Sequence, residues 1–178
     1  MARFAVIGIG NVLTGDDAIG PYVVKVLEAR YELPDDVLVM DAGTPGYDLT
    51  AIIAGLEAVI LVDAVKARGP AGELKLYDKA QLLSKAPVLA MSPHEPGVRE
   101  ALLNAEFQGV APPIVKLVGV VPFDLRLRTA LSPVVEATVP AAVEAVVQEL
   151  AALGVRAEPR REPRAPDLWW QKDAPAGQ

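Results

Sequence analysis

Four aspartates and the only histidine are the residues of this sequence best suited to chemistry. They are far apart along the chain, but each lies just after a predicted strand or just before a predicted helix. In an open parallel sheet, such positions gather at one edge, outside the carboxyl ends of the strands. The five residues expected along this edge are Asp16, Asp17, Asp41, Asp63 and His94.

Two carboxylates and one neutral imidazole from three different loops would make a small metal site. Imidazole suits zinc, copper, iron and nickel, and carboxylates add negative charge without requiring a soft metal. Three protein ligands also leave positions open for water or for a ligand from a partner. Structural roles are the alternative: Asp17 could cap the following helix, and Asp41 could brace the turn at residues 43–46. Asp63 is harder to explain this way, because it follows the most apolar run, where an unpaired carboxylate is costly.

Composition removes several other classes of site. The 178 residues carry a net charge of −6, with no cysteine and one histidine. Disulfides, thiolate metal sites and a cysteine nucleophile are therefore excluded, and no serine lies in a nucleophile-elbow motif. The acidic balance argues against a nucleic-acid surface, which needs clustered Lys and Arg. No segment is long enough to cross a membrane or reads as a secretory signal, so we expect a cytoplasmic protein.

A pair of glycines after the first predicted strand offers a second interpretation. Gly8 and Gly10 could belong to a dinucleotide-binding loop, but that fingerprint needs Gly or Ala at position 13, where Leu13 stands. The neighbouring acidic pair, Asp16 and Asp17, would also repel a pyrophosphate. The glycines could instead serve only to permit a tight turn. A nucleotide- or small-molecule-binding regulatory domain stays open as an alternative.

The elements that must position these residues alternate between strand and helix. Nearly continuous apolar runs predict four buried strands, and a fifth run with alternating charges predicts an edge strand. Helical spacing follows Pro21 and recurs in three later segments. The fold class is therefore α/β, a three-layer α/β/α sandwich around a mostly parallel five-stranded sheet. The strands are predicted at 4–9, 37–40, 58–62, 114–121 and 73–77, and the helices at 21–31, 47–56, 96–103 and 132–154.

The last predicted helix and the tail carry their own signals. Ser132 is a plausible N-cap, and Pro140 should kink the helix or delay its start. We expect residues 1–155 to form the domain, and residues 156–178, rich in proline and charge, to be a flexible tail. The tryptophans at 169–170 would either dock on the domain or anchor a partner.

At these positions the sequence resembles the hydrogenase maturation endopeptidases, over residues 3–155. Ala18 stands where many members carry glycine, and residues 156–178 lie outside the resemblance. The combination of motifs in this order is very specific. The matching motifs are Gly8-x-Gly10-Asn11-x-Leu13-x-x-Asp16-Asp17-x-x-Gly20, Asp41-x-Gly43-Thr44-x-Gly46, Val62-Asp63-Ala64, Ser92-x-His94, Val118-Gly119-Val120-Val121-Pro122 and Leu131-Ser132-Pro133.

The resemblance implies an endopeptidase that recognises a nickel-loaded large-subunit precursor of a nickel–iron hydrogenase and removes its C-terminal extension. The family fold is an α/β/α sandwich around a five-stranded sheet. The family's metal contacts map onto Asp17, Asp63 and His94, and Asp41 maps onto a further carboxylate. The nickel would be carried by the substrate, and cadmium or zinc could occupy the site in vitro.

Peptide hydrolysis then needs an activated water, because no covalent nucleophile is available. Our hypothesis is that Asp17, Asp63 and His94 reach the nickel, and that Asp41 or Asp16 acts as general base. The partner would be the precursor, with neither nucleic acid nor membrane involved, and the protein would be a monomer. A non-proteolytic chaperone that checks metal loading is the other alternative.

Overall fold

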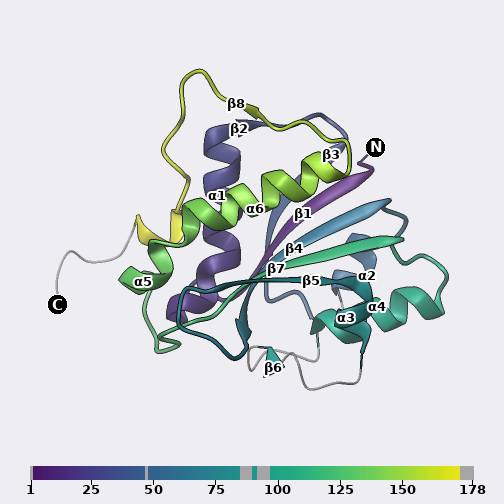
Figure 1. Ribbon diagram of the computed structural model, residues 1–178, viewed down its shortest axis with the longest axis horizontal. Helices are drawn as coiled ribbons and strands as arrows, with labels where there is room; N and C mark the ends of the chain where they lie inside the picture. Colours follow the sequence, from purple (N-terminus) through teal and green to yellow (C-terminus); the bar gives the residue numbers. More distant parts are fainter. Residues whose placement is uncertain (1, 47, 85–89, 92–96, 173–178) are drawn as a thin grey trace.

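A five-stranded, mostly parallel sheet forms the centre of the computed structural model, which describes residues 2–46, 48–84, 90–91 and 97–172 (Figure 1). Four strands are parallel, and the edge strand β5 is antiparallel to its neighbour β7. A short strand, β6, pairs antiparallel with the end of β4. In spatial order the strands are β3 (Val37–Gly43), β1 (Phe4–Ile9), β4 (Ala58–Lys66), β7 (Ile114–Val120) and β5 (Leu74–Asp78), with β6 at Ala90–Met91.

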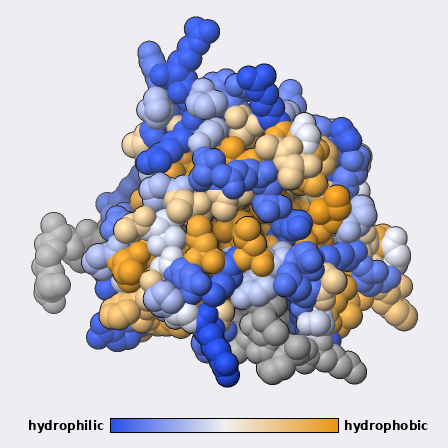
Figure 2. All heavy atoms as spheres, viewed as in Figure 1, coloured by the Kyte–Doolittle hydropathy of each residue, from blue (hydrophilic) through white to orange (hydrophobic). Residues whose placement is uncertain are grey.

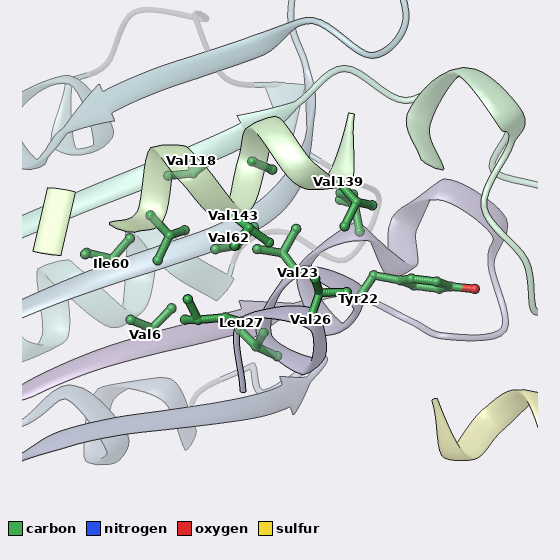
Figure 3. Packing of buried hydrophobic residues seen from close by; sticks show 14 of the residues in the cluster. Val6, Tyr22, Val23, Val26, Leu27, Ile60, Val62, Val118, Val139 and Val143 are labelled. Atoms are coloured by element: carbon green, nitrogen blue, oxygen red, sulfur yellow. The ribbon is translucent and has the colours of Figure 1, made fainter. Parts of the chain in front are cut away.

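Helices cover both faces of this sheet, as the sequence predicts. On one face α1 (Ile19–Arg30) and α6 (Val139–Ala152) lie against each other and the strands. Figure 3 shows valine and leucine side chains of α1 and α6 meeting those of β1, β4 and β7 there. The other face is covered by three shorter helices and has a separate hydrophobic cluster. These helices are α2 (Asp48–Ile53), α3 (Lys79–Leu83) and α4 (Gly97–Phe107).

The alternation of side chains along each strand supplies both hydrophobic clusters. In β1, Val6 packs on the α1 and α6 side, whereas Ala5 and Ile7 pack on the other. Successive side chains of a strand point to opposite faces, so a strand covered on both sides must be apolar throughout. This is why the continuous runs in the sequence predict the central strands correctly.

Pro140 delays the final helix, as the sequence predicts. A short helix, α5 (Pro133–Glu136), is followed by a break, and α6 begins at Val139 with Pro140 in its first turn. There the missing N–H of proline costs no intrahelical hydrogen bond. Helix α3 is an addition to the predicted elements, and it begins with a capping box between Asp78 and Gln81.

Residues 156–172 lie against α1 rather than apart from the domain. Strand β8 (Glu158–Pro159) pairs antiparallel with β2 (Tyr31–Glu32), which directly follows α1. Further on, a 3₁₀ turn, η2 (Trp169–Gln171), places the Trp170 ring edge-on to Tyr22, with 5.3 Å between ring centroids. Trp170 is only 6% exposed, so it docks on the domain.

The outer surface is mixed in character. On the face seen in Figure 2, hydrophobic side chains are exposed in small groups separated by charged ones. Among the residues that the structure describes, no helix has both the length and the apolar character needed to cross a bilayer.

Candidate functional site

Close backbone packing brings a short 3₁₀ turn, η1 (Gly15–Ala18), to the carboxyl ends of β1 and β4. The turn leads directly into α1, whose second residue is Gly20. A Cβ at Gly20 would collide with the backbone oxygens of Ile9 and Val62, so only glycine lets α1 approach this closely. The glycines of the first motif thus serve to place η1, and with it Asp16 and Asp17, against the edge of the sheet.

Asp17 is a buried carboxylate with one unused oxygen. Its side chain is 1% exposed, and Oδ2 accepts a hydrogen bond from the backbone N–H of Asn11 at 2.7 Å. Oδ1 is buried and has no hydrogen-bond partner among the described residues. Asp17 is not the N-cap of α1, since Ala18 holds that position without a side-chain bond. A buried oxygen left unpaired is costly, which indicates that a cation or donor belongs there.

Asp63 lies on β4, and it lines the same pocket as Asp17. It is buried within β4, which continues to Lys66 instead of ending before Asp63. Its Oδ1 accepts a hydrogen bond from the backbone N–H of Ala64 at 2.8 Å. Asp17 and Asp63 therefore come together from two elements that are 46 positions apart in the sequence, as the strand-end pattern predicts.

The two carboxylates line one small pocket together. Its other described walls are mostly apolar or glycine, and they come from the end of β1, the turn at 44–46, and the starts of α2 and α4. Negative charge between apolar walls favours a positively charged ligand, because screening by water is weak there. The walls are Ile9, Gly10, Thr44, Pro45, Gly46, Leu49, Gly97 and Val98.

His94, the third predicted metal ligand, lies outside the described residues. It precedes Gly97, a pocket-lining residue, by three positions in the sequence. Within the described part of the chain, no group of three or more His, Cys, Asp or Glu residues is arranged to hold a metal ion. The described ligand set is thus a pair of carboxylates, Asp17 and Asp63, and the role of His94 stays a prediction.

Asp41 braces a turn at the edge of the pocket. It pairs with Gly8 in the register of β3 and β1, and its Oδ1 accepts the backbone N–H of Gly43 at 2.9 Å. Gly43 has a φ of 58°, which favours glycine. Asp41 is not among the described pocket-lining residues. The structural role considered for Asp41, bracing this turn, is therefore observed.

Asp16 has a different environment from the one the sequence suggests. It is fully buried, and its carboxylate accepts four hydrogen bonds, at 2.6–2.9 Å. The donors are the backbone N–H groups of Phe123, Asp124 and Ser132 and the Ser132 hydroxyl. Such a carboxylate has no place for a substrate water, so the hypothesis of Asp16 as general base is not supported.

The loop between β7 and α5, at residues 121–132, is the part of the site region that the sequence analysis missed. Ser132 occupies the N-cap position of α5, but its hydroxyl donates to Asp16 instead of capping the helix. Asp124 pairs with Arg126 at 2.8 Å, and hydrogen bonds from Arg126 hold the pKa of Asp124 well below its usual range. The motif at residues 131–133 indicates that Ser132 matters, but its spacing does not reveal that Ser132 binds Asp16.

Comparison with known proteins shows which family the chain resembles. The family model described as hydrogenase maturation protease matches residues 21–149. The hydrogenase 2 maturation protease of Escherichia coli is 38% identical over 163 residues, covering 89% of this chain and 96% of the relative. The hydrogenase expression/formation protein HupD of Rhizobium leguminosarum is 32% identical, covering 90% of this chain and 80% of the relative.

Solved structures agree with the sequence relatives. The hydrogenase maturating endopeptidase HybD from E. coli has a TM-score of 0.80 and 37% identity, covering 89% of this chain and 98% of that one. The [NiFe] hydrogenase maturation protease HybD from Thermococcus kodakarensis has a TM-score of 0.67 and 25% identity, covering 84% and 99%. The chain is therefore a peptidase that belongs to the hydrogenase maturation protease family.

Proposed function

We propose that this protein removes a C-terminal extension from the large-subunit precursor of a nickel–iron hydrogenase, and that nickel in the precursor marks the substrate. The observation that carries the proposal is the buried Oδ1 of Asp17, which has no hydrogen-bond partner among the described residues and lies in a pocket that Asp63 shares. A carboxylate pair of this kind gains most from a cation, and nickel accepts oxygen and imidazole ligands. His94 would supply the imidazole.

The chain's own groups would divide the work as follows. The carboxylates of Asp17 and Asp63 would bind nickel carried by the precursor and so fix the position of its C-terminal segment. The metal could also polarise a carbonyl as a Lewis acid. Water activation is assigned to Asp41, through the oxygen that does not accept from Gly43.

The test is cleavage of a nickel-loaded precursor, followed by mass spectrometry of the product. Asp17→Asn and Asp63→Asn should each reduce the rate by at least about 100-fold, because amides cannot replace the charge of carboxylates at a cation. His94→Ala should behave alike. Asp35→Asn, at an exposed position, is the matched control and should leave the rate unchanged. Full activity of Asp17→Asn would contradict the assignment.

Nickel dependence is a separate arm of the same experiment. A nickel-free precursor should not be cut, whereas equal cleavage of both forms would show that nickel is not the signal. A chaperone that only checks metal loading would leave the precursor at full length. We expect no nucleotide to bind, because the two carboxylates of the pocket would repel its phosphates. We also propose that the enzyme works as a cytoplasmic monomer, which size-exclusion chromatography checks for the oligomeric state.

A further inference from the structure

Three large apolar side chains are exposed on the two loops that Asp16 joins. Leu13 is 53% exposed, Phe123 72% and Leu127 87%. Single exposed apolar side chains are ordinary, but several on adjoining segments mark an interaction surface. We call Leu13, Phe123 and Leu127 the apolar rim.

Backbone hydrogen bonds hold the two loops of the apolar rim side by side. The N–H of Arg128, the residue after Leu127, donates to the carbonyl of Leu13 at 3.0 Å. The N–H of Phe123 donates to the Asp16 carboxylate at 2.9 Å. All three members are thus attached to the segment 13–16, although two of them lie more than 100 positions further along the chain.

The residues on either side of this segment build part of the pocket. Gly10 lines it, and Asn11 donates its backbone N–H to Asp17. Leu13 follows two positions later, and its N–H donates to the Asn11 side chain at 2.9 Å. Asp16 and Asp17 are consecutive, so one turn anchors the rim through Asp16 and supplies the pocket through Asp17. A molecule seated on the apolar rim would therefore lie against the loop that holds Asp17.

Hydrogen bonds within the chain fix the loops that carry the apolar rim. Asp16 accepts four hydrogen bonds, all of them from the loop that carries Phe123 and Leu127 or from its end at Ser132. Arg126 pairs with Asp124 on the same loop at 2.8 Å. Loops that are already fixed lose little conformational entropy on binding. More of the free energy gained by burying their exposed side chains therefore appears as binding affinity.

We propose that the apolar rim is the docking surface for the folded body of the hydrogenase precursor, while its C-terminal segment enters the pocket. The inference rests on the proposed function, because it takes its occupant from there. A pocket at the edge of a sheet admits only a short segment, so a folded substrate must rest on the adjoining surface. Leucine and phenylalanine anchors on rigid loops would supply most of that binding energy.

The test separates binding from chemistry. The double variant Phe123→Ser with Leu127→Ser should raise KM for the nickel-loaded precursor by at least about tenfold, with kcat within about twofold. Phe107→Ser is the matched control. Phe107 is 94% exposed at the end of α4, which leads to the start of β7 and so lies at the opposite end of the sheet (Figure 1). The Phe107→Ser variant should have the same KM as the unaltered protein.

The possible outcomes distinguish the two proposals. If the unaltered protein cuts the precursor and the double variant has an unchanged KM, the rim is not the docking surface although the proposed function holds. If the unaltered protein cuts nothing, the proposed function itself fails. If the unaltered protein is a dimer in size-exclusion chromatography and the double variant a monomer, the rim joins two copies of this chain and the proposal is overturned. Leu127→Ser alone, at the more exposed position, should raise KM in the same direction and serves if the double variant unfolds.

Discussion

Asp16 accepts two hydrogen bonds from Ser132, one from the backbone N–H at 2.6 Å and one from the hydroxyl at 2.7 Å, across 116 positions of sequence. The same carboxylate binds the backbone N–H groups of Phe123 and Asp124. The residue next to it, Asp17, faces the pocket. The acidic pair therefore divides into an anchor for the loop before α5 and, under the proposed function, a ligand for the substrate's metal.

Replacing the anchor should destabilise the protein. In Asp16→Asn, one carboxylate oxygen becomes an amide N–H₂ group, which cannot accept a hydrogen bond. At least one of the buried N–H or O–H groups that donate to Asp16 would then lose its acceptor. We expect a loss of about 2–4 kcal/mol in the free energy of unfolding, measured by urea denaturation. Ser132→Ala removes one donor and should cost about 1 kcal/mol. Asp35→Asn, at an exposed position, should change little. A variant Asp16→Asn as stable as the parent would contradict the anchoring role.

The carboxylate pair should bind a divalent cation in the isolated protein. We expect cadmium to bind in calorimetric titration, and Asp17→Asn to weaken that binding by about tenfold or more, because Oδ1 of Asp17 is buried without a hydrogen-bond partner in the described part of the chain. Asp48→Asn, in the first turn of α2, is the control and should bind as the parent does. Equal affinity of the parent and Asp17→Asn would place the cation elsewhere.

The sheet could be predicted from sequence because its information is local. The run at residues 4–9 matches β1 in full, and the alternating run at 73–77 predicts the edge strand β5 to within one residue at each end. Burial on both faces imposes continuous apolar character, and burial on one face imposes alternation. The three-layer architecture follows from the order of these elements.

The division of labour within the acidic pair could not be predicted in the same way. Asp16 and Asp17 have identical side chains and adjacent positions, but Asp16 accepts from the loop at residues 121–132, whereas Asp17 accepts from Asn11 and lines the pocket. That loop has no periodicity, and its contacts to Asp16 span more than 100 positions. Local patterns carry no distance information across such separations. For the same reason, Trp170 could be expected to dock, but its contact with Tyr22 could not be foreseen.

Gly20 is a position where packing, rather than backbone conformation, requires glycine. A Cβ there would overlap the backbone oxygens of Ile9 and Val62, which cannot move without breaking the sheet. We expect Gly20→Ala to cost more than about 3 kcal/mol in the free energy of unfolding. Gly109 has a φ of 70°, and a Cβ there would meet no atom within 4 Å, so Gly109→Ala should cost only about 1 kcal/mol. Similar losses for both variants would show that the close approach is not maintained.

The two tryptophans of the tail should differ sharply. Trp170 is 6% exposed and packs on Tyr22, whereas Trp169 is 55% exposed. Trp170→Ala should therefore lower the free energy of unfolding by about 3 kcal/mol, and Trp169→Ala by less than about 1 kcal/mol. The Trp169→Ala variant keeps only the buried Trp170, and the Trp170→Ala variant keeps only the exposed Trp169. The fluorescence emission maximum of Trp169→Ala should therefore lie at a shorter wavelength than that of Trp170→Ala. Equal effects of the two substitutions would mean that the tail does not dock through Trp170.

Tyr22 should make the stability of the protein depend on alkaline pH. Its side chain lies at the edge of the hydrophobic cluster that α1 and α6 form with the sheet. The hydroxyl points away from the core (Figure 3) and accepts a hydrogen bond from the side-chain amide of Gln171. Burial raises the pKa of Tyr22 above its ordinary value of about 10. The unfolded chain therefore releases this proton first. The stabilisation that depends on the neutral phenol is complete below about pH 10 and is lost as the pH rises through the folded pKa.

Tyr22→Phe isolates that contribution. The variant cannot ionise at this position, so its Tm should fall less than that of the parent between about pH 8 and pH 11. It also loses the hydrogen bond from Gln171, which should lower its Tm by a constant amount at every pH. Tyr77, whose pKa is also raised by burial, is present in both proteins and cancels in the comparison. Parallel curves of Tm against pH would mean that Tyr22 ionises equally easily in the folded and unfolded chains, and that the docked tail does not shield it from water.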